Sequence, residues 1–183
     1  MKKNVDILFV ICPFWDVKFP PIGIAYISEF LKSKKLKTKV IDFNIKIYNN
    51  STKKDYWTIK TNFIWKLPGF LKKELNKCVE EVLASKSKII AFSIMAPNQL
   101  FSLKLIEKIK QKAPDKIIIT GGVQTPQGNS NYIDYHIKGE AEETTYELLS
   151  ALKNKRKVNT IPGIIIYKNK QSIQTIDRKI KNK

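Results

Sequence analysis

The stretch IIITGGVQTPQG, residues 117–128, decides how this chain is expected to fold. Its β-branched residues form an apolar run that is typical of a strand buried on both faces. Gly121 and Gly122 end that run abruptly, and adjacent glycines let a backbone approach another group closely. The stretch contains neither G-x-G-x-x-G nor G-x-x-x-x-G-K-S/T. The stretch therefore predicts a buried strand whose end carries no side chains, so that another group can approach its backbone closely. It does not predict a common phosphate-binding loop.

Strands and helices alternate along the rest of the chain. Short apolar runs predict strands over residues 5–12, 38–44, 88–95, 116–120 and 132–138. Amphipathic spacing predicts helices over residues 20–34, 70–85, 100–113 and 140–154. Such alternation favours right-handed βαβ crossovers. The expected fold class is α/β, a three-layer, doubly wound parallel sheet with a C-terminal β-hairpin over residues 161–176.

The predicted domain organisation is simple. We expect one domain over residues 1–160, followed by the hairpin and a basic tail over residues 161–183. Residues 45–69 are aromatic-rich and without clear periodicity, which is long for a connection in a compact domain. We therefore interpret 45–69 as an irregular insertion, a lid or a flap.

Composition indicates a globular protein. The 183 residues are 43% hydrophobic and 27% charged, which is typical of a folded domain. No apolar run is long enough to span a membrane, and no small-residue cleavage site follows the N-terminal run. Two cysteines do not make a disulfide framework. These features predict a cytoplasmic protein.

The net charge of +18 raises the alternative of a nucleic-acid or anionic-surface binding protein on the same fold. Arg156 and Arg178 are the only arginines, although arginine is the usual reader of phosphates and bases. The lysines are scattered along the whole chain. We favour a solvated lysine-rich surface over a nucleic-acid partner.

The loops that follow the predicted strands form the candidate site. In a doubly wound sheet, ligands bind outside the carboxyl ends of the strands. The first of these loops is rigid and aromatic, the third is small, and the fourth carries the paired glycines. Together they predict a broad slot for a large, flat ligand. The candidate binding residues are Phe14, Trp15, Pro21, Gly23, Ser93, Met95, Ala96, Pro97, Asn98, Gly121, Gly122, Val123, Gln124, Thr125, Gly139 and Glu140.

Other functions of this topology fit less well. A phosphoryl receiver needs an aspartate at the end of the third strand, where Ser93 stands instead. A dinucleotide site needs a glycine-rich first turn, so Asp42 alone is a weak ribose-binding signal. A small-molecule enzyme could use Asp134, Glu140 or Glu142, but capping and the helix dipole explain acids at a helix start.

The order of these loops resembles the N-terminal cobalamin-binding domain of B12-dependent radical SAM proteins, once called Fe–S oxidoreductases. Pro-Pro-x-Gly-x-x-Tyr opens the first helix, Val-x-Asp-x-Asn ends the second strand, and Gly-Gly ends the fourth. Asp-x-x-x-x-Gly-Glu-x-Glu and Pro-Gly-Ile follow. The matching residues are Pro20, Pro21, Gly23, Tyr26, Asp42, Asn44, Gly121, Gly122, Asp134, Gly139, Glu140, Glu142, Pro162, Gly163 and Ile164.

This resemblance implies a flavodoxin-like fold with strand order 2-1-3-4-5 and cobalamin as the occupant of the slot. By position, Ser93 and the backbone after Gly121 and Gly122 would face the buried nucleotide tail. Phe14, Trp15 and residues 95–98 would face the corrin ring. The implied function is a corrinoid-binding module that serves a radical SAM domain, or a degenerate family member that no longer binds the cofactor.

Two departures from related families limit the chemistry of this polypeptide. The Asp-x-His-x-x-Gly cobalt-ligand motif of methionine-synthase-type domains is missing after the first strand. His136 and Cys12 are interpreted as packed residues, so no metal ligand is predicted. Two cysteines cannot form Cys-x-x-x-Cys-x-x-Cys, so an iron–sulfur cluster and S-adenosylmethionine would belong to a radical SAM catalytic domain in cis or in trans. We therefore predict no catalytic residue and no catalysis by this polypeptide alone.

Overall fold

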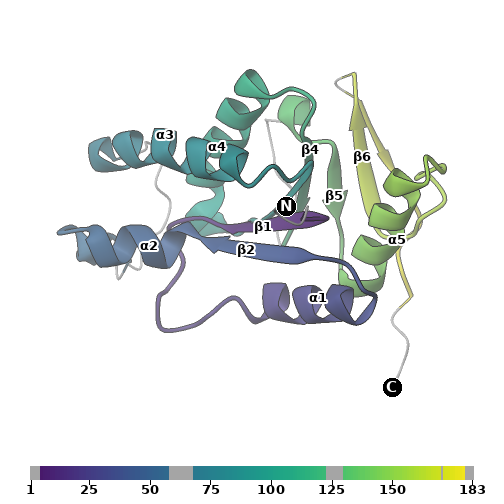
Figure 1. The fold of residues 1–183 in the computed structure, drawn as a ribbon, viewed down its shortest axis with the longest axis horizontal. Helices are drawn as coiled ribbons and strands as arrows, with labels where there is room; N and C mark the ends of the chain where they lie inside the picture. Colours follow the sequence, from purple (N-terminus) through teal and green to yellow (C-terminus); the bar gives the residue numbers. More distant parts are fainter. Residues whose placement is uncertain (1–4, 58–67, 123–129, 170, 180–183) are drawn as a thin grey trace.

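The computed structural model describes residues 5–57, 68–122, 130–169 and 171–179. Among these residues, one sheet runs in the order β2-β1-β3-β4-β5-β6-β7 (Figure 1). The strands are β1 (Ile7–Ile11), β2 (Thr38–Asp42), β3 (Ile89–Ser93), β4 (Ile117–Gly121), β5 (Tyr135–Ile137), β6 (Ile164–Lys168) and β7 (Gln171–Gln174). Strands β1 to β5 are parallel, whereas β6 and β7 are antiparallel to their neighbours.

The predicted fold class is confirmed. The order of the first five strands is 2-1-3-4-5, and a hairpin follows them, as in a flavodoxin-like fold. Lys168 and Gln171 are the pair of β6 and β7 nearest the turn of this hairpin. Strand β6 pairs with β5, so the hairpin continues the main sheet instead of standing apart from it. The predicted division near residue 160 stays a prediction.

Helices cover both faces of the sheet. The helices are α1 (Ile22–Ser33), α2 (Phe43–Asn50), α3 (Gly69–Ala84), α4 (Gln99–Lys112) and α5 (Glu142–Lys153). Helices α2, α3 and α4 lie on one face, and α1 and α5 lie on the other (Figure 1). No helix of the described segments has the length and apolar character needed to cross a bilayer.

Alternating strand residues divide the core into two parts, because successive side chains of a strand point to opposite faces. Leu8 and Val10 pack toward α3 and α4. Ile7 and Phe9 pack toward α1 and α5, where they meet Leu31. Strands β1, β3 and β4 are therefore buried on both sides, which explains their apolar sequences. Strand β2 lies at the edge of the sheet and exposes Lys39 and Val40.

The interpretation of residues 45–69 as irregular was wrong for its first part. Residues 43–50 form α2, and a 3-10 helix, η1 (Lys54–Trp57), follows. The side chain of Asp42 caps α2 by accepting a hydrogen bond from the Ile45 amide at 2.9 Å. Phe43 and Ile47, one helical turn apart, are buried on the same face. Residues 58–67 lie outside the described segments.

The strand register brings the predicted loops to one edge. Ser93 at the end of β3 pairs with Gly121 at the end of β4, and Gly121 pairs with Ile137 at the end of β5. The loops that follow these strands therefore leave the sheet side by side, as expected for a doubly wound fold.

Candidate ligand-binding site

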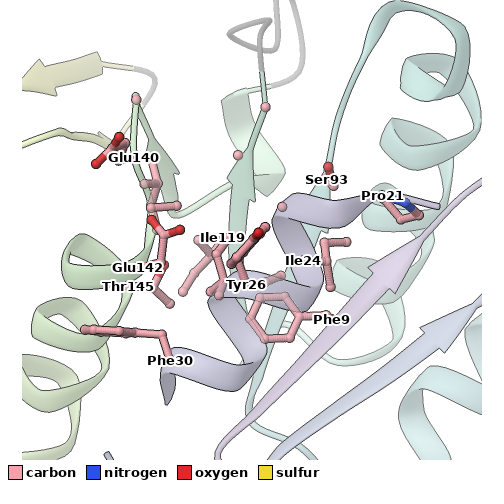
Figure 2. Close-up of a pocket in the computed structure, with 18 of the residues that line it drawn as sticks. Phe9, Pro21, Ile24, Tyr26, Phe30, Ser93, Ile119, Glu140, Glu142 and Thr145 are labelled. Carbon is pink, nitrogen blue, oxygen red and sulfur yellow. The ribbon is translucent and has the colours of Figure 1, made fainter. Parts of the chain in front are cut away.

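A cavity of about 1490 Å³ lies between α1 and α5 and opens at the carboxyl ends of the parallel strands (Figure 2). Its floor is the sheet face that carries Phe9, Ala91, Ile119 and Ile137. These residues come from four adjacent strands, and all four are buried. The floor is therefore a continuous apolar surface wide enough for a flat group.

Helices α1 and α5 supply the two walls. Ile24 and Phe30 from α1 line the cavity together with Thr145 from the first turn of α5 (Figure 2). Ile27 of α1 and Ala141, the residue before α5, line it as well. The spacing of Ile24, Ile27 and Phe30 along the sequence is typical of a buried helical stripe. Ile24 is buried, whereas Ile27 and Phe30 are only partly covered, because the cavity takes the place of packing partners.

The mouth of the cavity is more polar than its floor. Trp15, Pro21 and Ser93 line it beside Glu140 and Glu142. Tyr26 also lines it, although 65% of its surface is exposed. Glu142 and Glu143 occupy the first turn of α5, where the helix dipole stabilises carboxylates. The site thus combines an apolar interior with hydrogen-bond acceptors at its rim.

Glycines leave open space around this mouth. A Cβ atom on Gly23 or Gly139 would have no heavy atom within 4 Å. On Gly121 the nearest atom would be the Ile137 carbonyl oxygen at 3.8 Å, an ordinary contact. All three glycines line the cavity. A side chain at these positions would therefore compete with a ligand for space, and not with the protein's own packing.

Gly122 differs from its neighbour. It adopts a φ of +127°, and a Cβ there would lie 2.1 Å from the carbonyl oxygen of Ile94. The adjacent Ile94 amide donates to the Gly121 carbonyl at 2.8 Å. The chain after β4 therefore needs glycine at 122 for its own backbone packing. The sequence pattern suggested that both glycines leave room for a ligand. In the structure, only Gly121 lacks a close backbone neighbour that would itself require glycine.

The structure brings together half of the candidate residues. Trp15, Pro21, Gly23, Ser93, Gly121, Gly122, Gly139 and Glu140 all line the cavity. Phe14, Met95, Ala96, Pro97 and Asn98 are not part of its lining. Val123, Gln124 and Thr125 lie outside the described segments.

Phe14 lies on the other side of the sheet from the cavity floor. Its side chain is 5% exposed and packs edge-on against Trp57, with ring centroids 4.7 Å apart. The Phe14 amide also donates to the Pro97 carbonyl at 3.3 Å. Phe14 and the 95–98 loop therefore support each other in the core, while the next residue, Trp15, reaches the cavity.

Asn98 explains the shape of the loop after β3. It is completely buried, and its Oδ1 accepts from the Met95 amide at 2.8 Å. Its Nδ2 donates to the Ser93 carbonyl at 3.0 Å. The side chain thus satisfies backbone groups of a tight turn, which is a structural task.

The side chains of His136 and Cys12 point away from the cavity. His136 is 1% exposed, and its Nδ1 lies 3.0 Å from the Thr120 hydroxyl. Burial, and secondarily Lys138, lowers the pKa of His136 to about 4, so the ring is neutral at pH 7. Cys12 is fully buried, and burial strongly raises its thiol pKa. The prediction that both are packed residues is confirmed.

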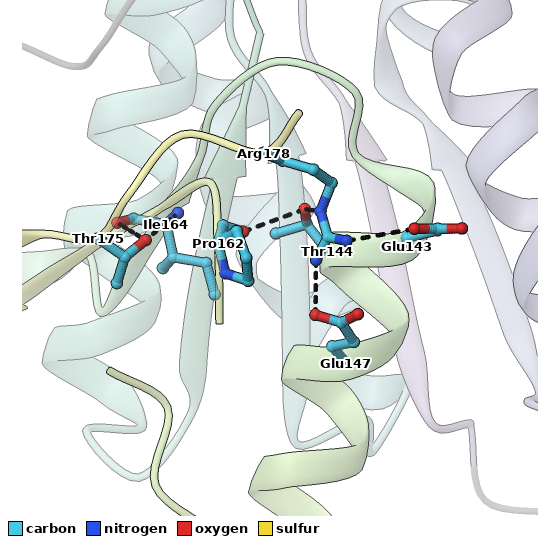
Figure 3. Close-up of polar contacts among 7 residues, drawn as sticks. All are labelled: Glu143, Thr144, Glu147, Pro162, Ile164, Thr175 and Arg178. Atoms are coloured by element: carbon cyan, nitrogen blue, oxygen red, sulfur yellow. Dashed lines mark hydrogen bonds and ion pairs between the residues drawn. The ribbon is translucent and has the colours of Figure 1, made fainter. Parts of the chain in front are cut away.

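The C-terminal segment is tied to the cavity wall by Arg178 (Figure 3). Its Nε donates to the Thr144 hydroxyl at 2.7 Å, and its guanidinium pairs with Glu143 at 3.2 Å and Glu147 at 2.5 Å. The Gly163 amide donates to the Ile176 carbonyl at 2.7 Å beside this clamp. Arg178 itself lines the cavity. The chain after β7 therefore leaves along the first turns of α5.

Sequence reasoning missed the floor and the walls. Strand residues such as Phe9 and Ile119 carry only the ordinary signal of core positions. Nothing in their spacing shows that a cavity opens between α1 and α5 above the sheet. The described residues contain no group of three or more His, Cys, Asp or Glu side chains placed to hold a metal ion.

This fold and cavity define a flavodoxin-like α/β domain with a large cavity at the carboxyl edge of its sheet. A family model described as the B12 binding domain matches residues 16–149. The match covers more than half of the chain, and the chain belongs to the B12-binding domain family. The resemblance inferred from the loop motifs is confirmed.

Solved structures of cobalamin-dependent radical SAM enzymes share the fold. The methyltransferase TsrM from Kitasatospora setae, determined with cobalamin and a 4Fe-4S cluster bound, matches 98% of this chain at a TM-score of 0.67 and 17% identity. OxsB, a cobalamin-dependent radical SAM enzyme determined with aqua-cobalamin bound, matches 96% at a TM-score of 0.66 and 17% identity.

The chain spans only part of each relative. It covers 30% of TsrM and 23% of OxsB. A curated relative, the anaerobic magnesium-protoporphyrin IX monomethyl ester cyclase of Synechocystis sp., is 30% identical in an alignment 79 residues long. The alignment covers 37% of this chain and 15% of the cyclase. These relatives are therefore much longer than this chain.

Proposed function

We propose that this chain binds cobalamin in the cavity between α1 and α5. The observation that carries the proposal is an open, apolar cavity of about 1490 Å³ at the ligand edge of a chain from the B12-binding domain family. The cavity has an apolar floor and a polar rim. At three glycines of the rim, an added Cβ would have no close neighbour in the protein. These features suit a ligand with one flat aromatic end and one broad end that carries many amides.

The floor and the rim would hold different parts of the cofactor. We assign the benzimidazole end of the nucleotide tail to the apolar floor at Phe9 and Ile119, beside Phe30 of the α1 wall. Ser93 would lie at the mouth above it. We assign the corrin ring to the mouth, beside Trp15 and Glu140. The carboxylate of Glu140 would accept hydrogen bonds from corrin amides. Phe14 and the 95–98 loop would support the ring-facing loop from behind.

We further propose that no histidine of this chain ligates the cobalt. The loop after β1 contains none, and His136 is the chain's only histidine. His136 lies across from Thr120 in the strand register, next to Ile137, whose side chain faces the cavity floor. Neighbouring strand residues face opposite sides of the sheet, so His136 points toward the α3–α4 layer.

Bound cobalamin supplies a cobalt centre that can carry and transfer an alkyl group. This chain's residues would bind the cofactor, orient it and shield its tail from water. We propose that the chemistry belongs to a radical SAM domain, in cis or in trans. The two cysteines of the 183 residues are both buried and cannot supply the three thiolates of a cluster site. The fold likeness to TsrM and OxsB supports this partner.

The test is direct binding of hydroxocobalamin. The protein is incubated with the cofactor, passed through gel filtration and read for corrinoid absorbance in the protein peak. Equilibrium titration followed by Trp fluorescence gives the affinity. We expect one corrinoid per chain. If none co-elutes and none is seen by titration, the chain is a family member that keeps the fold without the cofactor, and the proposal is wrong.

A further inference from the structure

Asn44 has a buried polar side chain and does not line the cavity. It lies in the first turn of α2 and is 1% exposed. Its Oδ1 accepts from the Trp15 amide at 2.9 Å and from the Trp57 indole Nε1 at 2.6 Å. Its Nδ2 donates to the Trp15 carbonyl at 2.9 Å. One carboxamide thus bonds both backbone groups of Trp15 and the side chain of Trp57.

These three bonds join segments that are distant in sequence. Trp15 belongs to the loop after β1 and lines the cavity. Trp57 ends η1, in the segment that follows α2. Both acceptor positions of the Asn44 oxygen are occupied, and its amide has a partner. The uncharged carboxamide of Asn44 thus supplies two acceptor contacts and one donor contact.

Aromatic packing reinforces the same connection. Trp57 packs edge-on against Phe14, the residue before Trp15, and against Tyr48 of α2 at a centroid distance of 5.4 Å. Farther along the loop, the Trp15 indole donates to the Phe19 carbonyl. Trp15 is therefore held by its backbone at Asn44 and by its side chain within its own loop.

We propose that Asn44 is a positioning residue for the cavity. It holds Trp15 at the mouth and, through Trp57, makes the position of Trp15 depend on the packing of η1. For the effect on cobalamin, this inference rests on the proposed function. The positional effect itself concerns the cofactor-free protein and stands independently of any ligand.

A merely structural Asn44 would stabilise the fold without controlling Trp15, so stability alone cannot test the inference. The protein is labelled with 5-fluorotryptophan, and the ¹⁹F resonances are assigned with Trp15→Phe, Trp57→Phe and Trp65→Phe variants. Spectra of the cofactor-free protein are then compared for wild type, Asn44→Ala and Asn44→Asp. Ser102→Ala is the control, because it removes a buried 2.8 Å hydrogen bond from α4 to the Asn98 carbonyl. Ser102 takes no part in the hydrogen bonds that Asn44 makes with Trp15 and Trp57.

We expect Asn44→Ala to shift and broaden both the Trp15 and the Trp57 resonances, and to weaken hydroxocobalamin binding by about tenfold or more. Asn44→Asp keeps the two acceptor contacts but loses the donor to the Trp15 carbonyl. The Trp15 resonance should therefore shift more than the Trp57 resonance. Trp57→Phe keeps an aromatic ring but removes the indole donor to Asn44. It should therefore shift the Trp15 resonance through Asn44. Ser102→Ala should leave both resonances in place.

Unchanged Trp15 resonances in Asn44→Ala and Trp57→Phe would overturn the inference, whatever happens to stability. If Asn44→Ala does not fold, Asn44→Asp and Trp57→Phe decide the question by the same readout. If wild type binds no corrinoid, the proposed function fails, while the ¹⁹F spectra still report whether Asn44 positions Trp15.

Discussion

A Cβ atom on Gly122 would lie 2.1 Å from the carbonyl oxygen of Ile94, closer than any real Cβ contact. The two residues follow neighbouring strands, β4 and β3, at the edge where the cavity opens. This contact decides which of two adjacent glycines serves the fold and which leaves room for a ligand.

Replacing Gly122 should therefore damage the fold. We expect Gly122→Ala to lower the free energy of unfolding by about 3 kcal/mol, because the new methyl meets backbone and φ is +127°. Gly121→Ala, whose Cβ would have 3.8 Å of clearance, should change it by less than about 1 kcal/mol. Urea denaturation measures both. Equal losses in the two variants would contradict the distinction.

Filling the mouth should weaken hydroxocobalamin binding without unfolding the protein. Gly23 lies within α1 and lines the cavity, and a Cβ on it would have no heavy atom within 4 Å. We expect Gly23→Phe to weaken hydroxocobalamin binding at least about tenfold. Its melting temperature should not fall, since glycine is a poor helix residue.

The matched control is Gly69→Phe. Gly69 is also the site of an unobstructed Cβ, at the start of α3, but it does not line the cavity. It should bind the corrinoid as wild type does. If Gly23→Phe binds with unchanged affinity, or if both variants lose binding together, the cavity between α1 and α5 is not the cobalamin site.

Arg178 should anchor the C-terminal segment to α5. We expect Arg178→Ala to lower the free energy of unfolding by about 1–2 kcal/mol, a modest value because Glu143 and Glu147 are partly exposed and screened by solvent. The local effect should be larger. Hydrogen exchange at the Gly163 amide, which bonds to the Ile176 carbonyl, should accelerate.

Arg178→Lys is the informative companion variant. Lysine keeps the charge but not the planar fork that reaches Thr144 and both carboxylates together. It should recover less than half of the lost protection at Gly163. Full recovery by lysine would show that charge alone holds the segment.

His136 should make the protein less stable in mild acid. Its folded pKa is lowered to about 4 from an ordinary 6.5, mainly by burial, so the unfolded chain binds a proton first as pH falls. The protonation of His136 therefore leaves the free energy of unfolding unchanged above pH 6.5. Between about pH 6.5 and 4 it lowers the free energy of unfolding by roughly 1.4 kcal/mol per pH unit.

Urea denaturation at pH 7, 6 and 5 measures this slope. His136→Gln keeps a polar side chain opposite Thr120 and has no proton to gain in this range, so its stability should vary less with pH. The difference between the two proteins isolates His136 from the carboxylates, which titrate in both. Parallel pH profiles would show that His136 does not account for acid sensitivity.

Much of the fold could be predicted because it depends on local patterns. Apolar runs such as 7–11 and 117–121 became parallel strands, and their alternation with helices predicted a doubly wound sheet. The strand order was predicted by the family resemblance. Helix α2 could not be recognised in this way. Asp42 looks like the end of a strand, and only the folded chain shows its carboxylate capping the Ile45 amide.

The candidate site divides along the same line. The sequence by itself determined which loops meet, because parallel strands bring their carboxyl ends to one edge. Only the tertiary structure decided what each side chain does there. Phe14 and Trp15 are adjacent, yet one packs against Trp57 and the other lines the cavity. Gly121 and Gly122 are identical in sequence terms, yet only at Gly122 would an added Cβ collide with the backbone of Ile94. The direction of a side chain and the close approach of two backbone segments depend on neighbours that are distant in the chain. A local sequence pattern does not contain those neighbours, so it cannot predict either property.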